Sequence, residues 1–216
     1  MKTLPARVRW AVHLLDPRPE DQILEVGGGS GLAAALICER LTAGRLLMID
    51  RSAVAVGRAA QRNAIHLASG RLVVAQSALA ALTVPPRSFD KALTINVNLF
   101  WATSPARELT VLRQALRPGG VLHVVYGAGG PTAPERIAKP VAAALREHGF
   151  TGISVTTAPA GFAITGRGAT GVVPRQHRPG PLTVGRLTRS TALGDAVTAI
   201  SRAAGPGSRG GMLNAV

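Results

Sequence analysis

Short apolar runs alternate along this chain with longer stretches that are rich in alanine and leucine. The short runs are bounded by turn residues and are typical of buried strands, whereas the longer stretches favour helices. Helices are expected at 5–15, 32–41, 52–68, 104–116 and 132–148, and strands at 23–26, 45–50, 71–75, 89–95 and 121–126. A terminal hairpin is expected from 151–157 and 161–165. This alternation of strands and helices predicts an α/β fold with a mostly parallel sheet.

Length and composition predict one folded domain with a sizeable core. The chain has 216 residues, of which 46% are hydrophobic. No apolar run is long enough to span a bilayer, and the N-terminus lacks the hydrophobic region of a signal peptide. A cytoplasmic protein without a membrane partner is therefore expected. The single cysteine, Cys38, excludes an internal disulfide and a cysteine-based zinc cluster, and no metal site is expected.

The chain is strongly basic, with a formal net charge of +14 from 25 Lys and Arg against 11 Asp and Glu. Such a balance favours an anionic partner, nucleic acid included. The basic residues are scattered singly, however, and only 3% of residues are aromatic, which leaves little surface for stacking on bases. A genome-wide preference for Arg and Ala codons would produce the same composition, so charge alone does not establish a nucleic-acid partner.

Residues 167–216 differ in composition from the rest of the chain. They hold seven Arg against one Asp, together with nine Gly and four Pro. Such a segment cannot bury enough apolar surface to build a core of its own. We predict a folded domain at 1–166, followed by a largely disordered basic tail that binds nucleic acid weakly and without sequence preference.

A glycine-rich stretch, Glu25 to Gly31, separates the first predicted strand from the helix that follows. It reads E-V-G-G-G-S-G and places four glycines in five positions. Gly27, Gly29 and Gly31 allow positive φ and a close approach of the backbone to a ligand. The helix that begins after them offers free N–H groups and a partial positive charge. This stretch is the strongest candidate for a binding site, although a tight turn without a ligand would use similar residues.

The dinucleotide fingerprint G-x-G-x-x-G/A fits this stretch poorly. Starting from Gly27 it fails at Leu32, and starting from Gly29 it needs Ala34 and comes late after the strand. Neither register explains Glu25. The pattern E-x-G-x-G-x-G resembles instead motif I of the class I S-adenosylmethionine-dependent methyltransferases. In that family the acid and the glycine loop surround the methionine portion of the cofactor, which here implies the residues Glu25, Gly27, Gly28, Gly29 and Gly31.

Asp50 ends the second predicted strand, 19 residues after Gly31. An acid at this place can accept hydrogen bonds from both ribose hydroxyls of a nucleotide. It could also cap the next helix, but Ser52 is available for that role. The resemblance therefore implies that Asp50, with Arg51 beside it, contributes to cofactor binding.

The third predicted strand departs from the family pattern. In the family an acid commonly follows this strand and contacts the adenine amino group, whereas this chain has Gln76 and Ser77. Either side chain can still form a hydrogen bond with adenine as a neutral partner. Gln76 and Ser77 are therefore kept as candidate cofactor residues.

The segment after the fourth predicted strand lies at the expected topological switch point, where open α/β sheets bind ligands. Asn96 and Asn98 offer amide groups there, and Phe100 and Trp101 offer apolar walls. Asn96 is a candidate cofactor residue, and the other three are candidate substrate residues. Phe100 could equally belong to the core, and Trp101 could be a surface anchor.

The resemblance covers about residues 5–166 through four motifs in family order, including Ser88-Phe89-Asp90 before the fourth strand and L-R-P-G-G at 116–120. It implies a Rossmann-like, seven-stranded and mostly parallel sheet with an antiparallel terminal hairpin. It also implies S-adenosylmethionine as the cofactor and methyl transfer as the activity.

The family has no universal catalytic residue, because the methyl group on a sulfonium is already activated and mainly needs an in-line approach. Four side chains are candidate bases, but none is assigned: His13, His66, His123 and Tyr126. His13 and Tyr126 are also candidate substrate residues. His123 is expected to be structural because it lies in the middle of a strand, and His66 is expected on a solvated helix face.

Two features argue against a nucleobase acceptor. The Asn/Asp-Pro-Pro-aromatic motif of exocyclic amine methylation is absent after the fourth strand, and Cys38 is badly placed to attack cytosine. The predicted function is methyl transfer from S-adenosylmethionine to a small-molecule acceptor. The alternatives are an RNA methyltransferase that uses the basic tail, and a non-catalytic S-adenosylmethionine-binding protein.

Overall fold

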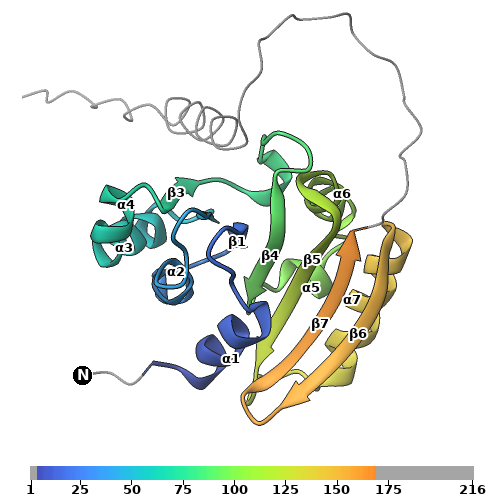
Figure 1. Ribbon diagram of the computed structural model, residues 1–216. Coiled ribbons are helices and arrows are strands. Elements are labelled where there is room, and N and C mark those ends of the chain that lie inside the picture. The colour runs from blue at the N-terminus through green and yellow to red at the C-terminus, as the bar shows by residue number, and fades with distance from the viewer. Residues whose placement is uncertain (1–3, 169–216) are drawn as a thin grey trace, which may run out of the picture.

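A computed structural model describes residues 4–168 and shows a seven-stranded sheet with helices on both faces (Figure 1). The strands are β1 (Gln22–Val26), β2 (Arg45–Asp50), β3 (Leu72–Gln76), β4 (Phe89–Ile95), β5 (Leu116–Gly127), β6 (Phe150–Ala158) and β7 (Gly161–Gly168). The helices are α1 (Ala6–Leu15), α2 (Leu32–Cys38), α3 (Ala53–Arg62), α4 (Ala64–Ala68), α5 (Leu99–Ala102), α6 (Ala106–Ala115) and α7 (Pro134–Glu147), with a 3-10 turn at Leu79–Ala81.

The sheet order is β3-β2-β1-β4-β5-β7-β6. β1 to β5 pair in parallel, and β7 and β6 follow in antiparallel orientation. The predicted fold class is therefore confirmed. The carboxyl ends of β1, β2 and β4 meet at one edge of the sheet, called the carboxyl edge below, and the opposite one is the amino edge. The strand order reverses between β1 and β4, so the switch point lies at the carboxyl edge.

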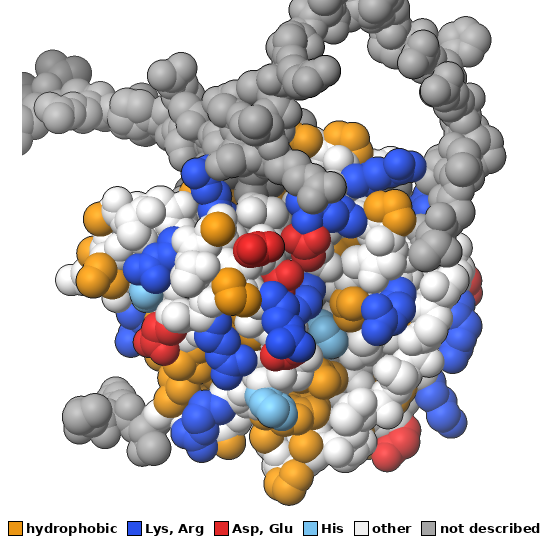
Figure 2. All heavy atoms as spheres, viewed as in Figure 1, with side chains coloured by type: hydrophobic (Ala, Val, Ile, Leu, Met, Phe, Trp, Pro, Cys, Tyr) orange, Lys and Arg blue, Asp and Glu red, His pale blue; other side chains and the backbone are white. Residues whose placement is uncertain are grey.

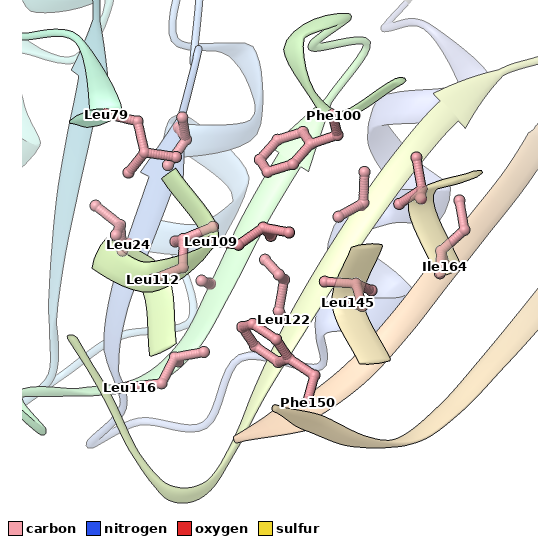
Figure 3. Packing of buried hydrophobic residues seen from close by; sticks show 14 of the residues in the cluster. Leu24, Leu79, Phe100, Leu109, Leu112, Leu116, Leu122, Leu145, Phe150 and Ile164 are labelled. Carbon is pink, nitrogen blue, oxygen red and sulfur yellow. The ribbon is translucent and has the colours of Figure 1, made fainter. Parts of the chain in front are cut away.

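Two apolar clusters cover the two faces of the sheet. One contains the inward sides of α6 and α7, where Leu109, Leu112 and Leu145 pack over Leu122 of β5 (Figure 3). The other contains α1, α2 and Ala59 of α3. The near-continuous apolar character of β1 and β2 follows from this arrangement, because a strand covered on both faces has no solvated side.

Several predicted boundaries differ from the structure for identifiable reasons. The helix predicted at 52–68 is divided into α3 and α4 at Asn63, whose backbone is not helical. β5 begins at Leu116 instead of residue 121, because Leu116 pairs with Phe89 at the start of β4. α6 begins at Ala106, and Ser104 does not cap it. The expected cap at Ser52 is confirmed, since its side chain accepts a hydrogen bond from the Ala55 N–H at 3.2 Å.

β7 continues to Gly168, past the domain boundary predicted at residue 166. The rest of the predicted basic tail lies outside the described residues. None of the helices within 4–168 is long and apolar enough to cross a bilayer. Figure 2 shows Lys and Arg side chains spread over the visible face instead of gathered in one block, as the scattered basic residues in the sequence indicated.

Candidate functional site

The glycine loop connects β1 to α2 at the carboxyl edge. The Gly27 and Gly28 N–H groups donate to the Ile49 carbonyl of β2 at 2.8 and 3.3 Å. The Gly31 N–H donates to the Gly28 carbonyl at 3.0 Å and closes the turn. Gly27, Gly29 and Gly31 have φ of 69°, 57° and 73°, so the expectation of positive φ at these three positions is confirmed.

The four glycines fall into two groups, according to what a side chain at each position would meet. A Cβ at Gly28 would lie 2.5 Å from Met48 Cγ, one at Gly31 would lie 2.5 Å from Asn63 Nδ2, and one at Gly27 would lie 2.6 Å from Val97 Cγ2. These three positions are therefore closed by the protein's own packing. A Cβ at Gly29, in contrast, would meet no atom of residues 4–168 within 4 Å. Gly29 is where the loop faces open space that a ligand can occupy.

Asp50 is directly connected to this loop. One carboxylate oxygen accepts from the Gly29 N–H and the other from the Ser52 N–H, both at 2.9 Å. Asp50 therefore contacts both the start of α3, which was the alternative role considered for it, and the glycine loop. Each oxygen keeps a further acceptor position, so the half-buried carboxylate can still receive ribose hydroxyls.

The turn after β2 and the end of β3 hold each other in place. The Gln76 side-chain amide donates to the Arg51 carbonyl at 3.1 Å, and the Ser77 N–H donates to the Asp50 carbonyl at 2.9 Å. The Ser77 hydroxyl donates to the Ala78 carbonyl at 3.0 Å. The structure therefore brings these candidate residues to one edge beside Asp50, with Gln76 and Arg51 exposed.

Glu25 is the least ordinary group of the site. Its side chain is only 2% exposed, and its Oε2 atom has no hydrogen-bond partner among the described residues. Burial, and to a smaller extent the negative charge of Asp50, raises the pKa of Glu25 to about 8. A buried acceptor without a partner costs free energy, and such groups concentrate at functional sites. A cationic ligand at the loop would supply the missing partner.

Two residues that support the loop were missed in the sequence. The Asn63 amide, fully buried, donates to the carbonyls of Gly31 and Ala59 at 3.0 and 2.9 Å. The Arg62 Nε donates to the Ser30 carbonyl at 2.9 Å. The only sequence signal was an Asn within a long helical stretch, where it is unfavourable without a special role.

Replacing Asn63 should destabilise the fold and loosen the loop. We expect Asn63→Ala to lower the free energy of unfolding by roughly 1–3 kcal/mol, because it removes one of the two donors to the buried Gly31 carbonyl, leaving the Ala35 N–H, and creates a cavity. Gln61→Ala, at an exposed position in the last turn of α3, should change it by less than about 0.5 kcal/mol. Urea denaturation of both variants measures the difference, and equal values would contradict the supporting role.

The segment after β4 forms the other wall of the switch point. Asn96 has a φ of 57°, and its side-chain oxygen accepts from the Gly127 N–H at 2.8 Å. The Tyr126 hydroxyl donates to the Val97 carbonyl at 2.9 Å, and its ring stacks on Phe162 with centroids 5.3 Å apart. Because Tyr126 is 5% exposed and burial raises its pKa, the structure places it in the core, below the segment that it holds.

The other candidate substrate residues of this segment differ in exposure. Phe100 is 2% exposed and belongs to the core cluster, which matches the alternative left open for it. Trp101 is half-buried, and its indole N–H is buried without an acceptor among the described residues. Asn98 is exposed and starts the short helix α5.

The three histidines considered as bases lie on three different elements, α1, α4 and β5. His13 is exposed on α1, near the end that meets the amino edge, where the Lys91 ammonium donates to the Asp16 carbonyl at 2.6 Å. His123 is buried in β5 beside Thr165, at 3.0 Å from Nδ1 to the hydroxyl, and burial lowers its pKa to about 4. The expectation of a solvated His66 is wrong, because α4 packs on the sheet and leaves this side chain 9% exposed.

Arg7, in the first turn of α1, lies at the carboxyl edge. It is a further residue of the site that was missed in the sequence. A Cβ at Gly127 would lie 2.7 Å from Arg7 Cδ, so the arginine stem crosses the end of β5 because residue 127 is a glycine. Arg7 is exposed and makes no ion pair with any residue within 4–168. Arg7 therefore adds a cationic side chain whose stem lies beside Gly127, the residue whose N–H donates to Asn96.

Residues 23–120 match the model of a family described as a methyltransferase domain. This match supports a class I S-adenosylmethionine-dependent methyltransferase domain in the chain. Among curated proteins, this chain is 30% identical over 170 residues to the trans-aconitate 2-methyltransferase of Deinococcus radiodurans. The match covers 75% of this chain and 62% of that relative, so the chain spans less than two thirds of the relative's length.

Solved structures share the methyltransferase fold at low identity. A S-adenosylmethionine-dependent methyltransferase from Aquifex aeolicus has a TM-score of 0.61 at 17% identity, covering 75% of this chain and 89% of that one. The cyclase SpnF has a TM-score of 0.62 at 19% identity, covering 76% and 80%. Because a cyclase and a methyltransferase share this fold, the fold does not determine the reaction.

Proposed function

We propose that the chain binds S-adenosylmethionine at the carboxyl edge and transfers its methyl group to a small-molecule acceptor. The observation that carries this proposal is the buried carboxyl of Glu25, whose Oε2 atom has no partner among the described residues and whose pKa is raised by burial and by Asp50, the acceptor of the Gly29 N–H. An ammonium or sulfonium cation suits such an acceptor, and S-adenosylmethionine carries both. When bound, this cofactor supplies a methyl group that is already activated on sulfur.

Each of the residues present would contact a different part of such a ligand. Glu25 faces the cationic portion, Gly29 allows a close approach of the backbone, and Asp50 accepts the ribose hydroxyls. Gln76 and Ser77 lie where a base would extend, with neutral hydrogen-bonding groups in place of an acid. Asn96, oriented by the Gly127 N–H, borders the acceptor side. This arrangement of contacts suits in-line methyl transfer, which depends on the positions of the reactants more than on a base.

Binding measurements test this proposal first. Isothermal titration calorimetry with S-adenosylmethionine, S-adenosylhomocysteine and NAD should give saturable heat for the first two only. Tighter binding of NAD would contradict the cofactor assignment. Methyl transfer is then measured as formation of S-adenosylhomocysteine with candidate acceptors. Binding without turnover on any acceptor would favour the non-catalytic alternative.

For the acceptor we propose a small carboxylate. The relative from Deinococcus radiodurans is named for trans-aconitate, a tricarboxylate. Arg7 supports the same class here, because this exposed residue has its stem beside Gly127 at the carboxyl edge and forms no ion pair with a described acid. Arginine binds carboxylates in bidentate geometry. The RNA alternative depends on the basic tail, which lies outside the described residues.

Removal of Arg7 should weaken acceptor use without affecting the cofactor. With trans-aconitate as the acceptor, Arg7→Ala is expected to raise KM by about tenfold or more, which is the loss of one charge-assisted hydrogen-bonded pair. The dissociation constant of S-adenosylhomocysteine should stay unchanged. Arg9→Ala is the matched control, because Arg9 is exposed on the same helix and donates instead to the Leu4 carbonyl. Equal effects of the two changes would remove Arg7 from acceptor binding.

A further inference from the structure

A hollow of about 760 Å³ lies at the amino edge, opposite the glycine loop. Its walls come from the loop before β4, the last turn of α6 and the start of β5, and Gly168 at the end of β7 borders it. The volume is within the range of pockets that hold small ligands. Nothing in the proposed methyl transfer uses this region.

The floor of the hollow is apolar. Leu82 and Leu116 are buried members of the core cluster that lies under α6 and α7, and Val84 and Val111 are partly buried against the same cluster. A ligand with an apolar body would therefore rest on side chains that are already held in place by the core. Burial of its hydrocarbon surface on this floor would favour binding.

The rim is cationic. Arg87, Arg113 and Arg117 line the hollow, and no Asp or Glu among residues 4–168 does. Arg117 is neutralised by its ion pair with Asp90. Arg87 and Arg113 take part in no ion pair within residues 4–168, where the ion pairs involve Arg18, Lys91 and Arg117. Two guanidinium groups are thus available for an anion beside an apolar floor.

The backbone at Arg87 supports a role for its side chain. Arg87 has a φ of 57°, in the left-handed region, directly after Pro85-Pro86. Turns of this kind normally select glycine at such a position, because a larger residue is strained there. The conformation is fixed by hydrogen bonds from the Arg87 and Ser88 N–H groups to the carbonyls of Gln114 and Ala115, at 2.8 and 2.9 Å. A strained arginine where glycine would be more stable indicates that the guanidinium is useful.

We propose that this hollow is a second binding site, which takes an amphipathic anion with a carboxylate head and an apolar body. Arg87 and Arg113 hold the head, and Leu82, Val84, Val111 and Leu116 contact the body. The site is separate from the carboxyl edge and does not depend on the proposed function.

Calorimetric titration of the full chain with decanoate tests this site. We expect one site per chain, and an affinity for acetate at least tenfold lower because acetate has no apolar body. Arg87→Gly and Arg113→Gln should each weaken decanoate binding by at least fivefold. Arg58→Gln and Arg40→Gln, which remove exposed charges that do not line the hollow, should leave it unchanged. Gly29→Val should also leave it unchanged, since it alters the opposite edge.

The thermal midpoint of Arg87→Gly separates a ligand role from a structural one. Glycine relieves the strain at positive φ, so this variant should unfold at the same temperature as the parent chain or higher, although it binds decanoate less tightly. Decanoate affinity that is equal in Arg87→Gly, Arg113→Gln and the two control variants would overturn the proposal. Several weak sites per chain, or equal affinity for acetate, would overturn it as well.

Discussion

Gly29→Val is expected to weaken binding of S-adenosylmethionine by about 100-fold or more, equivalent to about 3 kcal/mol. The new side chain would project into the only part of the glycine loop where a Cβ meets nothing within 4 Å. At Gly27, Gly28 and Gly31 a side chain would instead collide with Val97, Met48 or Asn63, so a loss of binding there could reflect misfolding. Gly29 is therefore the position at which ligand exclusion can be measured separately from packing.

Gly70→Val is the matched control for this change. Gly70 has a φ of 72° against 57° at Gly29, and a Cβ there also meets nothing within 4 Å, but it lies in the turn before β3, away from the loop. Both variants carry the strain of a β-branched residue in the left-handed region, roughly 1–2 kcal/mol. Calorimetric binding and thermal unfolding should show similar destabilisation in both and loss of the cofactor in Gly29→Val alone. Wild-type affinity in Gly29→Val would refute a ligand at this loop.

The sequence was informative wherever a pattern is local. The bounds of β2 and β4 were predicted to the residue, because short apolar runs ended by charged or turn residues determine a buried strand. The loop at Gly27 to Gly31 and its positive φ values could be predicted for the same reason, since glycine spacing is a local property. Asp50 and Gly29 lie close together because β1 and β2 pair in parallel, so that the residues after both strands meet at the same edge.

Features that depend on contacts between distant segments could not be predicted. Asn63 supports the loop through the Gly31 carbonyl, 32 positions earlier in the chain. Tyr126 was considered for substrate contact, but the antiparallel register places it opposite Phe162 and turns its hydroxyl toward the Val97 carbonyl. The arrangement of Arg7 over Gly127 depends on how α1 docks on the sheet. No periodicity within one segment reports such pairings.

Glu25→Gln should stabilise the folded chain at pH 8 and at the same time weaken cofactor binding. The pKa of Glu25 is about 8 in the folded chain against 4.5 for an unperturbed carboxyl. Between these values the folded state binds more protons than the unfolded state, so stability falls as the pH rises, by roughly 3–5 kcal/mol over the window. The neutral amide removes this loss. Urea denaturation at pH 5, 6, 7 and 8 should show the advantage of Glu25→Gln growing with pH.

The same carboxyl makes cofactor binding dependent on pH. A cation beside Glu25 favours the ionised form, so binding should release close to one proton at pH 7, and affinity should rise about tenfold per unit from pH 6 to 7. The ligand's own α-amino group, with a pKa of about 8, stays largely protonated over this range. Calorimetry in buffers of different ionisation enthalpy counts the released proton. Glu25→Gln should bind more weakly and without this dependence, whereas a wild-type affinity that is flat with pH would mean that Glu25 does not face the cationic portion of the ligand.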